Sequence, residues 1–211
     1  MITIIESAIA NLGSVRAALQ RVGVAASVSA DPHSIRNASA LLLPGVGAFG
    51  DGMASLHRNG LVEPIQAAAA AGTPILGICL GMQLLAEESE EFGRHKGLGL
   101  IRGRVVRMTP AAGEHVPNIG WCDLTPTRIS TLYPAVKAET PFYFVHSYRL
   151  VCGDPIDETA TIVFGGAPVT VGIERGNIFG AQFHPEKSQD AGLMVLAAFV
   201  NHAAGPHRHV A

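Results

Sequence analysis

The residues best suited to chemistry in this sequence are a cysteine at a glycine-flanked turn and a histidine followed closely by a glutamate. Cys79 ends an apolar run and lies between Gly77 and Gly81, with a helical pattern starting directly after it. A strand that delivers its last residue to a sharp turn before a helix forms a nucleophile elbow, here with sulfur in place of a serine oxygen. The N–H groups and dipole of the helix N-terminus favour a thiolate and help to hold a developing oxyanion.

A base for this nucleophile follows the last apolar run of the sequence. Residues 179–183 read as a strand, so His184 emerges at its carboxyl end, where open α/β sheets place their chemistry. Pro185 stops the strand, and Glu186 is near enough to turn back and hydrogen-bond to His184. A nucleophilic cysteine needs a base, and the base needs a third group that fixes its tautomer. The spacing therefore predicts a triad of Cys79, His184 and Glu186.

Each triad residue also has a purely structural interpretation. A lone cysteine is usually an inert buried side chain, His184 alone would suit a surface position at a strand end, and Glu186 would suit a helix N-terminus. Finding all three together favours the triad. Cys122 and Cys152 lack such a setting and are expected only to pack. Because the cysteines are not spaced as zinc ligands and none lies near His184, we expect no metal and no cofactor.

Composition narrows the class of protein. The chain has 211 residues, of which 48% are hydrophobic and 15% charged, which indicates one globular domain over residues 1–202 and a frayed tail over 203–211. A net charge of −2 gives no basic footprint for nucleic acid or an anionic membrane. The N-terminus lacks the basic segment of a signal peptide, the alanine-rich stretch 65–71 is too short to span a bilayer, and an odd cysteine count fits the reducing cytoplasm.

The elements that must position the triad alternate between strands and helices. Apolar runs suited to strands fall at residues 1–5, 24–28, 40–43 and 73–78. Helical patterns fall at residues 12–22 (capped by Asn11), 51–71 (interrupted at 59–60) and 80–91. This alternation predicts an α/β fold with a mostly parallel sheet covered on both faces. Shorter β-type runs at 104–108, 142–151, 160–164 and 169–174 indicate an antiparallel or mixed extension, before a last strand at 176–183 and a closing helix at 189–202.

Residues 77–83, read together with His184-Pro-Glu186, resemble the class I (triad) glutamine amidotransferases. Further motifs narrow the resemblance to the glutaminase subunits (HisH type) of imidazole glycerol phosphate synthase, over about residues 11–202. These motifs are Pro44-Gly-Val-Gly47, Pro117-Asn-Ile-Gly-Trp121, Tyr143-Phe-Val-His-Ser-Tyr148 and His184-Pro-Glu-Lys-Ser188. The resemblance implies a single-domain flavodoxin-like fold, with a central sheet flanked by helices and an antiparallel extension.

The resemblance also implies a role for each matching residue. Cys79 would attack the side-chain amide of glutamine, His184 would protonate the departing ammonia, and Glu186 would orient His184. An oxyanion loop and substrate contacts would come from Gly45, Val46, Gly47, Leu80, Gln83, His146, Ser147 and Tyr148. The partner interface would include Asn11, Trp121, Tyr143 and Lys187. The partner would be a (β/α)₈-barrel cyclase subunit (HisF type) that receives the ammonia in a heterodimer serving histidine biosynthesis, and glutaminase activity would be low without it.

One segment departs from the family pattern. The family usually has Asp-Tyr-Gly-x-Gly-Asn after the first strand, whereas this sequence has Glu6-Ser-Ala-Ile-Ala-Asn11. Alanine restricts backbone angles that glycine leaves open, so the change bears on coupling to the partner and leaves the triad intact. Three alternatives remain: a paralogue that supplies ammonia to a different synthase, a stand-alone γ-glutamyl cysteine hydrolase, and a non-enzymatic regulator of a synthase.

Overall fold

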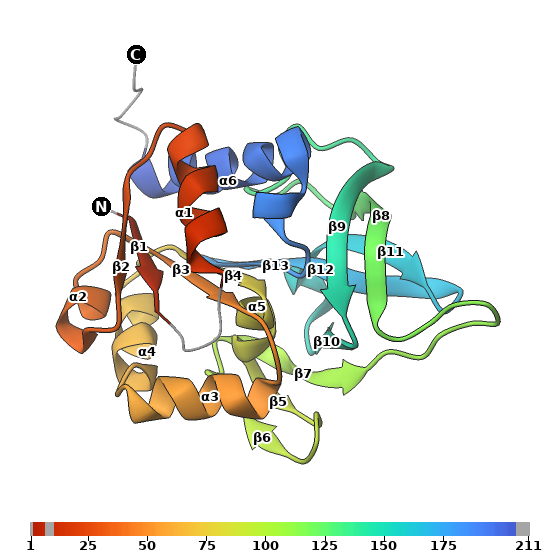
Figure 1. Cartoon of the computed structure of the whole chain (residues 1–211), viewed down its shortest axis with the longest axis horizontal. Coiled ribbons are helices and arrows are strands. Elements are labelled where there is room, and N and C mark those ends of the chain that lie inside the picture. The colour runs from red at the N-terminus through yellow and green to blue at the C-terminus, as the bar shows by residue number, and fades with distance from the viewer. Residues whose placement is uncertain (1, 7–10, 206–211) are drawn as a thin grey trace.

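A nine-stranded sheet runs through the centre of the molecule (Figure 1). The structure, a computed structural model, describes residues 2–6 and 11–205. Five neighbouring strands are parallel, in the order β2 (Ala26–Ser29), β1 (Ile2–Ile5), β3 (Ala40–Gly45), β4 (Ile75–Cys79) and β13 (Ile178–Ala181). Four antiparallel strands complete the sheet: β12 (Ala167–Arg175), β11 (Glu158–Phe164), β8 (Asn118–Pro126) and β9 (Thr140–His146). The prediction of an α/β fold with an antiparallel extension is confirmed, although β8 was not expected and the run at 104–108 pairs in a second sheet instead.

Helices cover both faces of the parallel half of the sheet. Figure 1 shows α1 (Leu12–Arg21) and α6 (Gln189–Ala204) on one face, with α3 (Phe49–Arg58) and α4 (Val62–Ala70) on the other. The short helix α2 (Pro32–Arg36) contacts α4. Each face of the sheet has its own hydrophobic core, and successive residues of a strand point to opposite faces. Leu42 packs with the side chains of α1 and α6, whereas Leu41 and Leu43 pack with those of α2, α3 and α4. Burial on both faces explains the unbroken apolar runs of these strands.

A second, four-stranded sheet was not predicted from the sequence. Its order is β10 (Tyr148–Cys152), β7 (Ile101–Arg107), β5 (Ala86–Ser89) and β6 (His95–Lys96). The expected helix over residues 80–91 is therefore wrong: α5 (Leu80–Leu84) is short, and β5 begins two residues later. Pairing with β6 and β7 buries Ala86 and Ser89, which outweighs the helical propensity of the glutamates around them. The run 142–151 likewise divides at Ser147, with β9 in the large sheet and β10 in the small one.

Helices α1, α3, α4 and α6 agree with the sequence patterns, although α6 continues two residues past its predicted end; α2 and two 3₁₀ turns were not predicted. Asn11 caps α1, because its side chain accepts a hydrogen bond from the Ser14 N–H at 3.3 Å. The interruption near residues 59–60 separates α3 from α4. Two 3₁₀ turns, η1 (Pro155–Asp157) and η2 (Pro185–Lys187), precede β11 and α6. The altered segment after Glu6 and the tail beyond Gly205 lie outside the described residues. Within residues 2–6 and 11–205, the helices are too short or too polar to cross a membrane.

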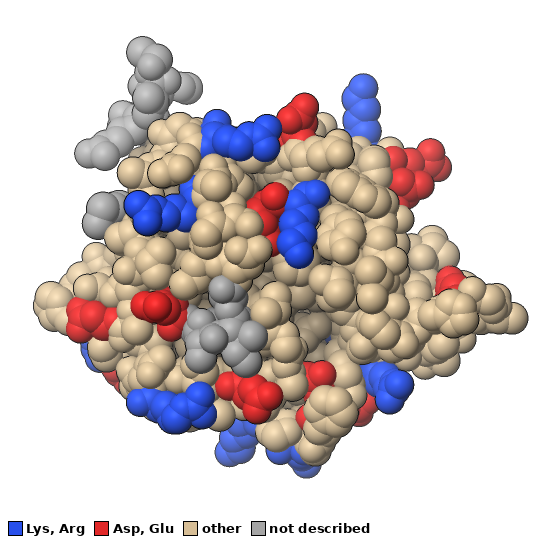
Figure 2. All heavy atoms as spheres, in the orientation of Figure 1, with Lys and Arg blue, Asp and Glu red and all other residues tan. Residues whose placement is uncertain are grey.

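Positively and negatively charged side chains form no separate patches on the face of the molecule shown in Figure 2. Lysine and arginine side chains alternate there with aspartate and glutamate side chains across a largely uncharged surface. Interspersed charges of both signs produce no extended field that would attract a polyanion.

Replacing Gly81 by alanine is expected to destabilise the fold. A β-carbon at Gly81 would stand 1.6 Å from the Leu43 carbonyl oxygen, so β3 or α5 would have to move. We expect the free energy of unfolding to fall by about 3 kcal/mol, measured by denaturant titration. Gly13→Ala is the control, since nothing lies within 4 Å of that β-carbon and alanine favours a helix by up to about 1 kcal/mol. Equal stability of the two variants would contradict the packing described here.

Candidate active site

The turn between β4 and α5 holds Cys79 in the geometry of a nucleophile elbow. Cys79 is the last residue of β4, and its φ of +54° lies in a region that side-chain-bearing residues rarely adopt. A β-carbon at Gly77 would stand 2.6 Å from the Gly81 carbonyl oxygen, and Gly81 itself lies against the backbone of β3. The two glycines are therefore required by close backbone approach on both sides of the cysteine. A strained backbone of this kind is typical of functional positions.

His184 and Glu186 form a buried pair beyond the end of β13. The Nδ1–H of His184 donates to Oε1 of Glu186 at 2.8 Å, and both side chains are less than 5% exposed. The His184 N–H donates to the Tyr143 carbonyl at 3.0 Å, which fixes this backbone against β9. Ser188 adds a second link, because its hydroxyl donates to the His184 carbonyl at 2.7 Å and accepts from the Tyr143 N–H. The imidazole ring is therefore held by Glu186, and the backbone of His184 is held by Tyr143 and Ser188.

The surroundings of His184 favour its protonated form. Burial alone lowers the pKa of His184, but the Cys79 side chain and the Glu186 carboxylate both raise it, to about 9. β4 and β13 are adjacent parallel strands, so their carboxyl ends bring Cys79 and His184 to one edge of the sheet. Among the described residues, Nε2 of His184 has no hydrogen-bond partner of normal geometry. The sulfur and the imidazole thus interact without a formed hydrogen bond between them.

A network of buried polar side chains begins beside Cys79 and reaches the backbone of β10. Gln83 on α5 is buried, and its Nε2 donates to the Tyr148 carbonyl at 3.0 Å and to Oε1 of Gln182 at 2.9 Å. His146 is also buried, with Nδ1 2.9 Å from the same carbonyl. Because a carbonyl only accepts, this nitrogen carries the proton, and Nε2 is left to accept from Asn118 at 3.4 Å. Burial, together with a smaller effect of nearby His184, lowers the pKa of His146 to about 4, so its imidazole is neutral.

The loop after β3 lies beside the elbow. Gly45 is paired with Cys79 across β3 and β4, and a β-carbon there would stand 3.1 Å from that of Leu80. Val46 follows, and Gly47 is exposed with a φ of +92°, which favours glycine. The carboxylate of Glu91 accepts the Phe49 N–H at 2.7 Å and thereby holds the start of α3. The loop thus lies close to the nucleophile, and the helix α3 that follows it is held at its N-terminus by Glu91.

Comparison with known proteins agrees with this geometry. The model of the class I glutamine amidotransferase family matches residues 2–203. The chain belongs to this family. It is 43% identical to the imidazole glycerol phosphate synthase subunit HisH of Sulfurimonas denitrificans, over 96% of this chain and 98% of the relative. It is 48% identical to the HisH subunit of Symbiobacterium thermophilum, over 93% and 91%.

Solved structures of glutamine amidotransferases share the fold. "Structure of PurLQS from Thermotoga maritima" aligns with a TM-score of 0.76 at 21% identity, covering 95% of this chain and 97% of the other. "Crystal structure of glutamine amidotransferase" aligns with a TM-score of 0.75 at 18% identity, covering 97% and 100%. At such identities the likeness concerns the fold alone. It confirms the fold that the motifs of this class I glutamine amidotransferase predicted.

Three of the four residues predicted at a partner interface form one cluster on this amidotransferase. Trp121 and Tyr143 are paired across β8 and β9, with ring centroids 5.9 Å apart, and the Lys187 ammonium lies 5.6 Å from the centre of the Tyr143 ring. Trp121 is 49% exposed, which is unusual for so large an apolar side chain. Asn11 is exposed at the start of α1, and in the described ranges no hydrogen bond or ring contact joins it to the other three.

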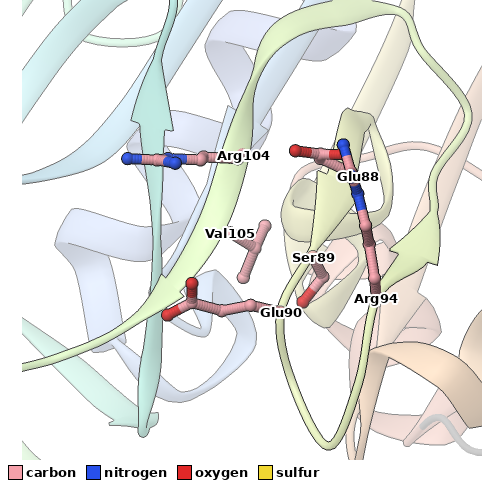
Figure 3. A pocket seen from close by; sticks show the side chains of 6 residues that line it. All are labelled: Glu88, Ser89, Glu90, Arg94, Arg104 and Val105. Carbon is pink, nitrogen blue, oxygen red and sulfur yellow. The ribbon is translucent and has the colours of Figure 1, made fainter.

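A cavity elsewhere on the molecule contains none of the predicted site residues. It has a volume of about 180 Å³ and lies against β5 and β7 (Figure 3). Figure 3 shows Arg94 reaching Glu88, with which it forms an ion pair, while Arg104 points away from both. The described part of the chain contains no group of three or more histidine, cysteine and carboxylate side chains placed to hold a metal. The amidotransferase residues around Cys79 therefore remain the candidate active site.

Two residues of the site were missed as site residues by the sequence analysis. Gln182 is fully buried and its Nε2 donates to the Cys79 sulfur at 3.7 Å, while Asn118 reaches His146 from β8. Gln182 lies two residues before His184, and alternate residues of a strand face the same side. The two-residue spacing from His184 was the sequence signal that could have placed Gln182 in the site. Nothing comparable in the sequence links Asn118 to His146.

Replacing Glu186 by glutamine is expected to lower the pKa of His184. The substitution removes the negative charge of Glu186, while burial still opposes the imidazolium and Cys79 still favours it, so the pKa falls below its value of about 9. NMR titration of the His184 ring signals measures the change. Glu63→Gln on α4 is the control, because Glu63 pairs with Arg36 at the surface. A pKa that stays near 9 in Glu186→Gln would contradict the described pair.

The same pair makes stability depend on pH. Because the folded-state pKa of His184 is raised above 6.5, its protonation stabilises the fold fully below about pH 6.5, and this stabilisation is lost as pH rises through about 9. Denaturant titrations across this window should show the loss for the unmodified chain and a flatter profile for Glu186→Gln.

Proposed function

We propose that this chain is the glutaminase subunit of an imidazole glycerol phosphate synthase and acts in the cytoplasm in histidine biosynthesis. The observation that carries the proposal is the convergence of an elbow cysteine with a buried histidine–glutamate pair. The chain belongs to the class I glutamine amidotransferases and covers nearly the full length of relatives that are named HisH subunits of this synthase. The motifs at residues 44–47 and 184–188 point to the same subfamily.

The triad would release ammonia from glutamine in two steps. The Cys79 sulfur adds to the side-chain amide carbon, and the C–N bond then breaks as the leaving nitrogen takes a proton from His184. This produces ammonia and a glutamyl thioester. Water then attacks the thioester, His184 accepts a proton from it, and glutamate leaves with return of the sulfur. Glu186 accepts the Nδ1–H throughout, which keeps Nε2 directed to the reacting groups.

The residues around the triad suit an acyl transfer. Backbone N–H groups of the loop Gly45–Gly47 and of Leu80 would stabilise the oxyanion that forms when sulfur adds to the carbonyl. Gly45 and Leu80 lie directly beside Cys79, as such donors must. Gln83 and the backbone of residues 146–148 would hold the amino-acid end of the substrate. The Cys79 sulfur lies 3.9 Å from the Val145 carbonyl and Gln83 donates to the Tyr148 carbonyl, which supports this assignment.

A partner subunit would use the ammonia. Free ammonia is quickly protonated in water, and ammonium has no lone pair with which to attack a carbon, so direct transfer through a protected path is chemically favoured. We assign the partner as a (β/α)₈-barrel cyclase that forms a heterodimer with this chain. The exposed cluster of Trp121, Tyr143 and Lys187 supports docking at β8 and β9, because aromatic side chains dominate protein interfaces.

The first test measures glutamate released from glutamine, by the chain alone and with a liganded cyclase barrel. We expect low activity alone, a large rise with the partner, and a loss of about 10⁴-fold or more in Cys79→Ala because the nucleophile is gone. Cys152→Ala is the matched control, since this cysteine is half-buried on β10 and should leave the rate unchanged. Equal activity with and without the partner would refute the coupled subunit and favour a stand-alone hydrolase.

A second test concerns the docking face. Trp121→Ala should weaken binding of the cyclase barrel by about 2 kcal/mol, or about 30-fold in Kd, because a partly exposed tryptophan at an interface centre contributes most of its area there. Isothermal titration calorimetry measures the change. The control is Val163→Ala on β11, where a side chain that is 74% exposed is removed from another part of the surface. If both variants bind as tightly as the unmodified chain, the partner does not dock at β8 and β9.

A further inference from the structure

Two buried glutamines connect the backbone of β10 to the nucleophile. Nε2 of Gln83 donates to the Tyr148 carbonyl at 3.0 Å and to Oε1 of Gln182 at 2.9 Å. Nε2 of Gln182 then donates to the Cys79 sulfur at 3.7 Å. Gln182 is fully buried and Gln83 is 5% exposed, so water competes little for these bonds. The Gln182 N–H also donates to the Val171 carbonyl at 2.9 Å, which fixes the backbone from which its side chain extends.

The direction of this chain of bonds is set by the Tyr148 carbonyl. A backbone carbonyl can only accept, so Gln83 must present its NH₂ group to it. That NH₂ group also faces Gln182, which must therefore present its oxygen to Gln83 and its nitrogen to Cys79. Turning either amide around would place two acceptors or two donors in contact. The orientation of both amides thus follows from the hydrogen-bond network itself.

The direction of the hydrogen bonds has one consequence at Cys79 and another at Gln83. At Cys79, Gln182 offers an N–H donor, and a donor stabilises a negatively charged sulfur more than a neutral thiol. At Gln83, both N–H groups are committed, so the oxygen Oε1 is the group that remains to accept a hydrogen bond from a substrate. The ammonium group of an amino acid is a donor of the required kind. One side chain, Gln182, therefore serves the nucleophile and the substrate contact together.

We propose that Gln182 is a positioning residue: its NH₂ group favours the charged form of the Cys79 sulfur, and its oxygen keeps Gln83 turned so that Oε1 faces the substrate ammonium. This inference rests on the proposed glutaminase function and adds to it a residue outside the triad. Gln182 touches no atom of the substrate and acts through its two neighbours.

The test is Gln182→Met, which keeps the length of the side chain and removes both hydrogen bonds. Alkylation of Cys79 by iodoacetamide is followed by mass spectrometry of the peptide that contains Cys79. It should need a higher pH, and its rate near neutrality should be about tenfold lower. With glutamine and the cyclase partner, kcat should fall and KM should rise. Gln66→Met is the matched control, because among residues 2–6 and 11–205 the Gln66 side chain donates to the Leu98 carbonyl and not toward Cys79, so it should change none of these readouts.

A second variant separates the two ends of the network. Gln83→Met should raise KM for glutamine about tenfold, while the pH profile of Cys79 alkylation shifts less than in Gln182→Met, because Gln182 still carries a donor beside the sulfur. In the double variant, KM should rise no further than in Gln83→Met, since both substitutions interrupt the same path to the substrate. If thermal unfolding shows that Gln182→Met does not fold, Gln182→Glu takes its place; it retains an acceptor for Gln83, replaces the donor to sulfur and should move the profile in the same direction.

The alkylation assay requires neither glutamine nor a partner, so it separates the two proposals. An unchanged alkylation profile in folded Gln182→Met would overturn the role of Gln182 and leave the glutaminase function intact. A shifted profile in a chain that releases no glutamate with its partner would overturn the proposed function alone.

Discussion

The close contact between Gly81 and the Leu43 carbonyl is the constraint on which the site depends. A β-carbon at Gly81 would stand 1.6 Å from that oxygen, so only glycine lets the start of α5 approach β3 so closely. Next to this contact, the pairing of β3 with β4 sets Gly45 beside Cys79, so the loop after β3 begins at the elbow. Cys79 between these close contacts has a positive φ, which costs about 1–3 kcal/mol and persists only where packing holds it.

Two buried histidines near the elbow take opposite charge states, and their partners explain why. His184 faces a carboxylate and a thiol, which raise its pKa to about 9 despite burial. His146 faces a carbonyl and an amide, and burial lowers its pKa to about 4. The charge on His184 also disfavours a second charge on His146. The site therefore holds one imidazolium, placed on the residue that the proposed reaction requires as the proton donor.

The sequence predicts those parts of the molecule whose signals are local. Strands β3 and β4 are short apolar runs, and Cys79, His184 and Glu186 each lie in a short pattern that explains their chemistry. Leucine and glutamate in residues 80–91 favour a helix, and only the pairing of β5 with β7 shows a strand there instead. Gln182 was not assigned a role because its partners Gln83 and Cys79 lie 99 and 103 residues away in the sequence.

Strand β9 links the proposed docking face to both reacting residues. The carbonyl of Val145 accepts from the Cys79 sulfur at 3.9 Å, and the carbonyl of Tyr143 accepts from the His184 N–H at 3.0 Å. Both carbonyls belong to one edge strand, whose Tyr143 ring contacts Trp121 and Lys187. Since Nε2 of His184 has no partner within the described residues, the nucleophile and the base are held separately by β9. A subunit seated on Trp121 and Tyr143 would therefore act on both groups through the same few residues of backbone.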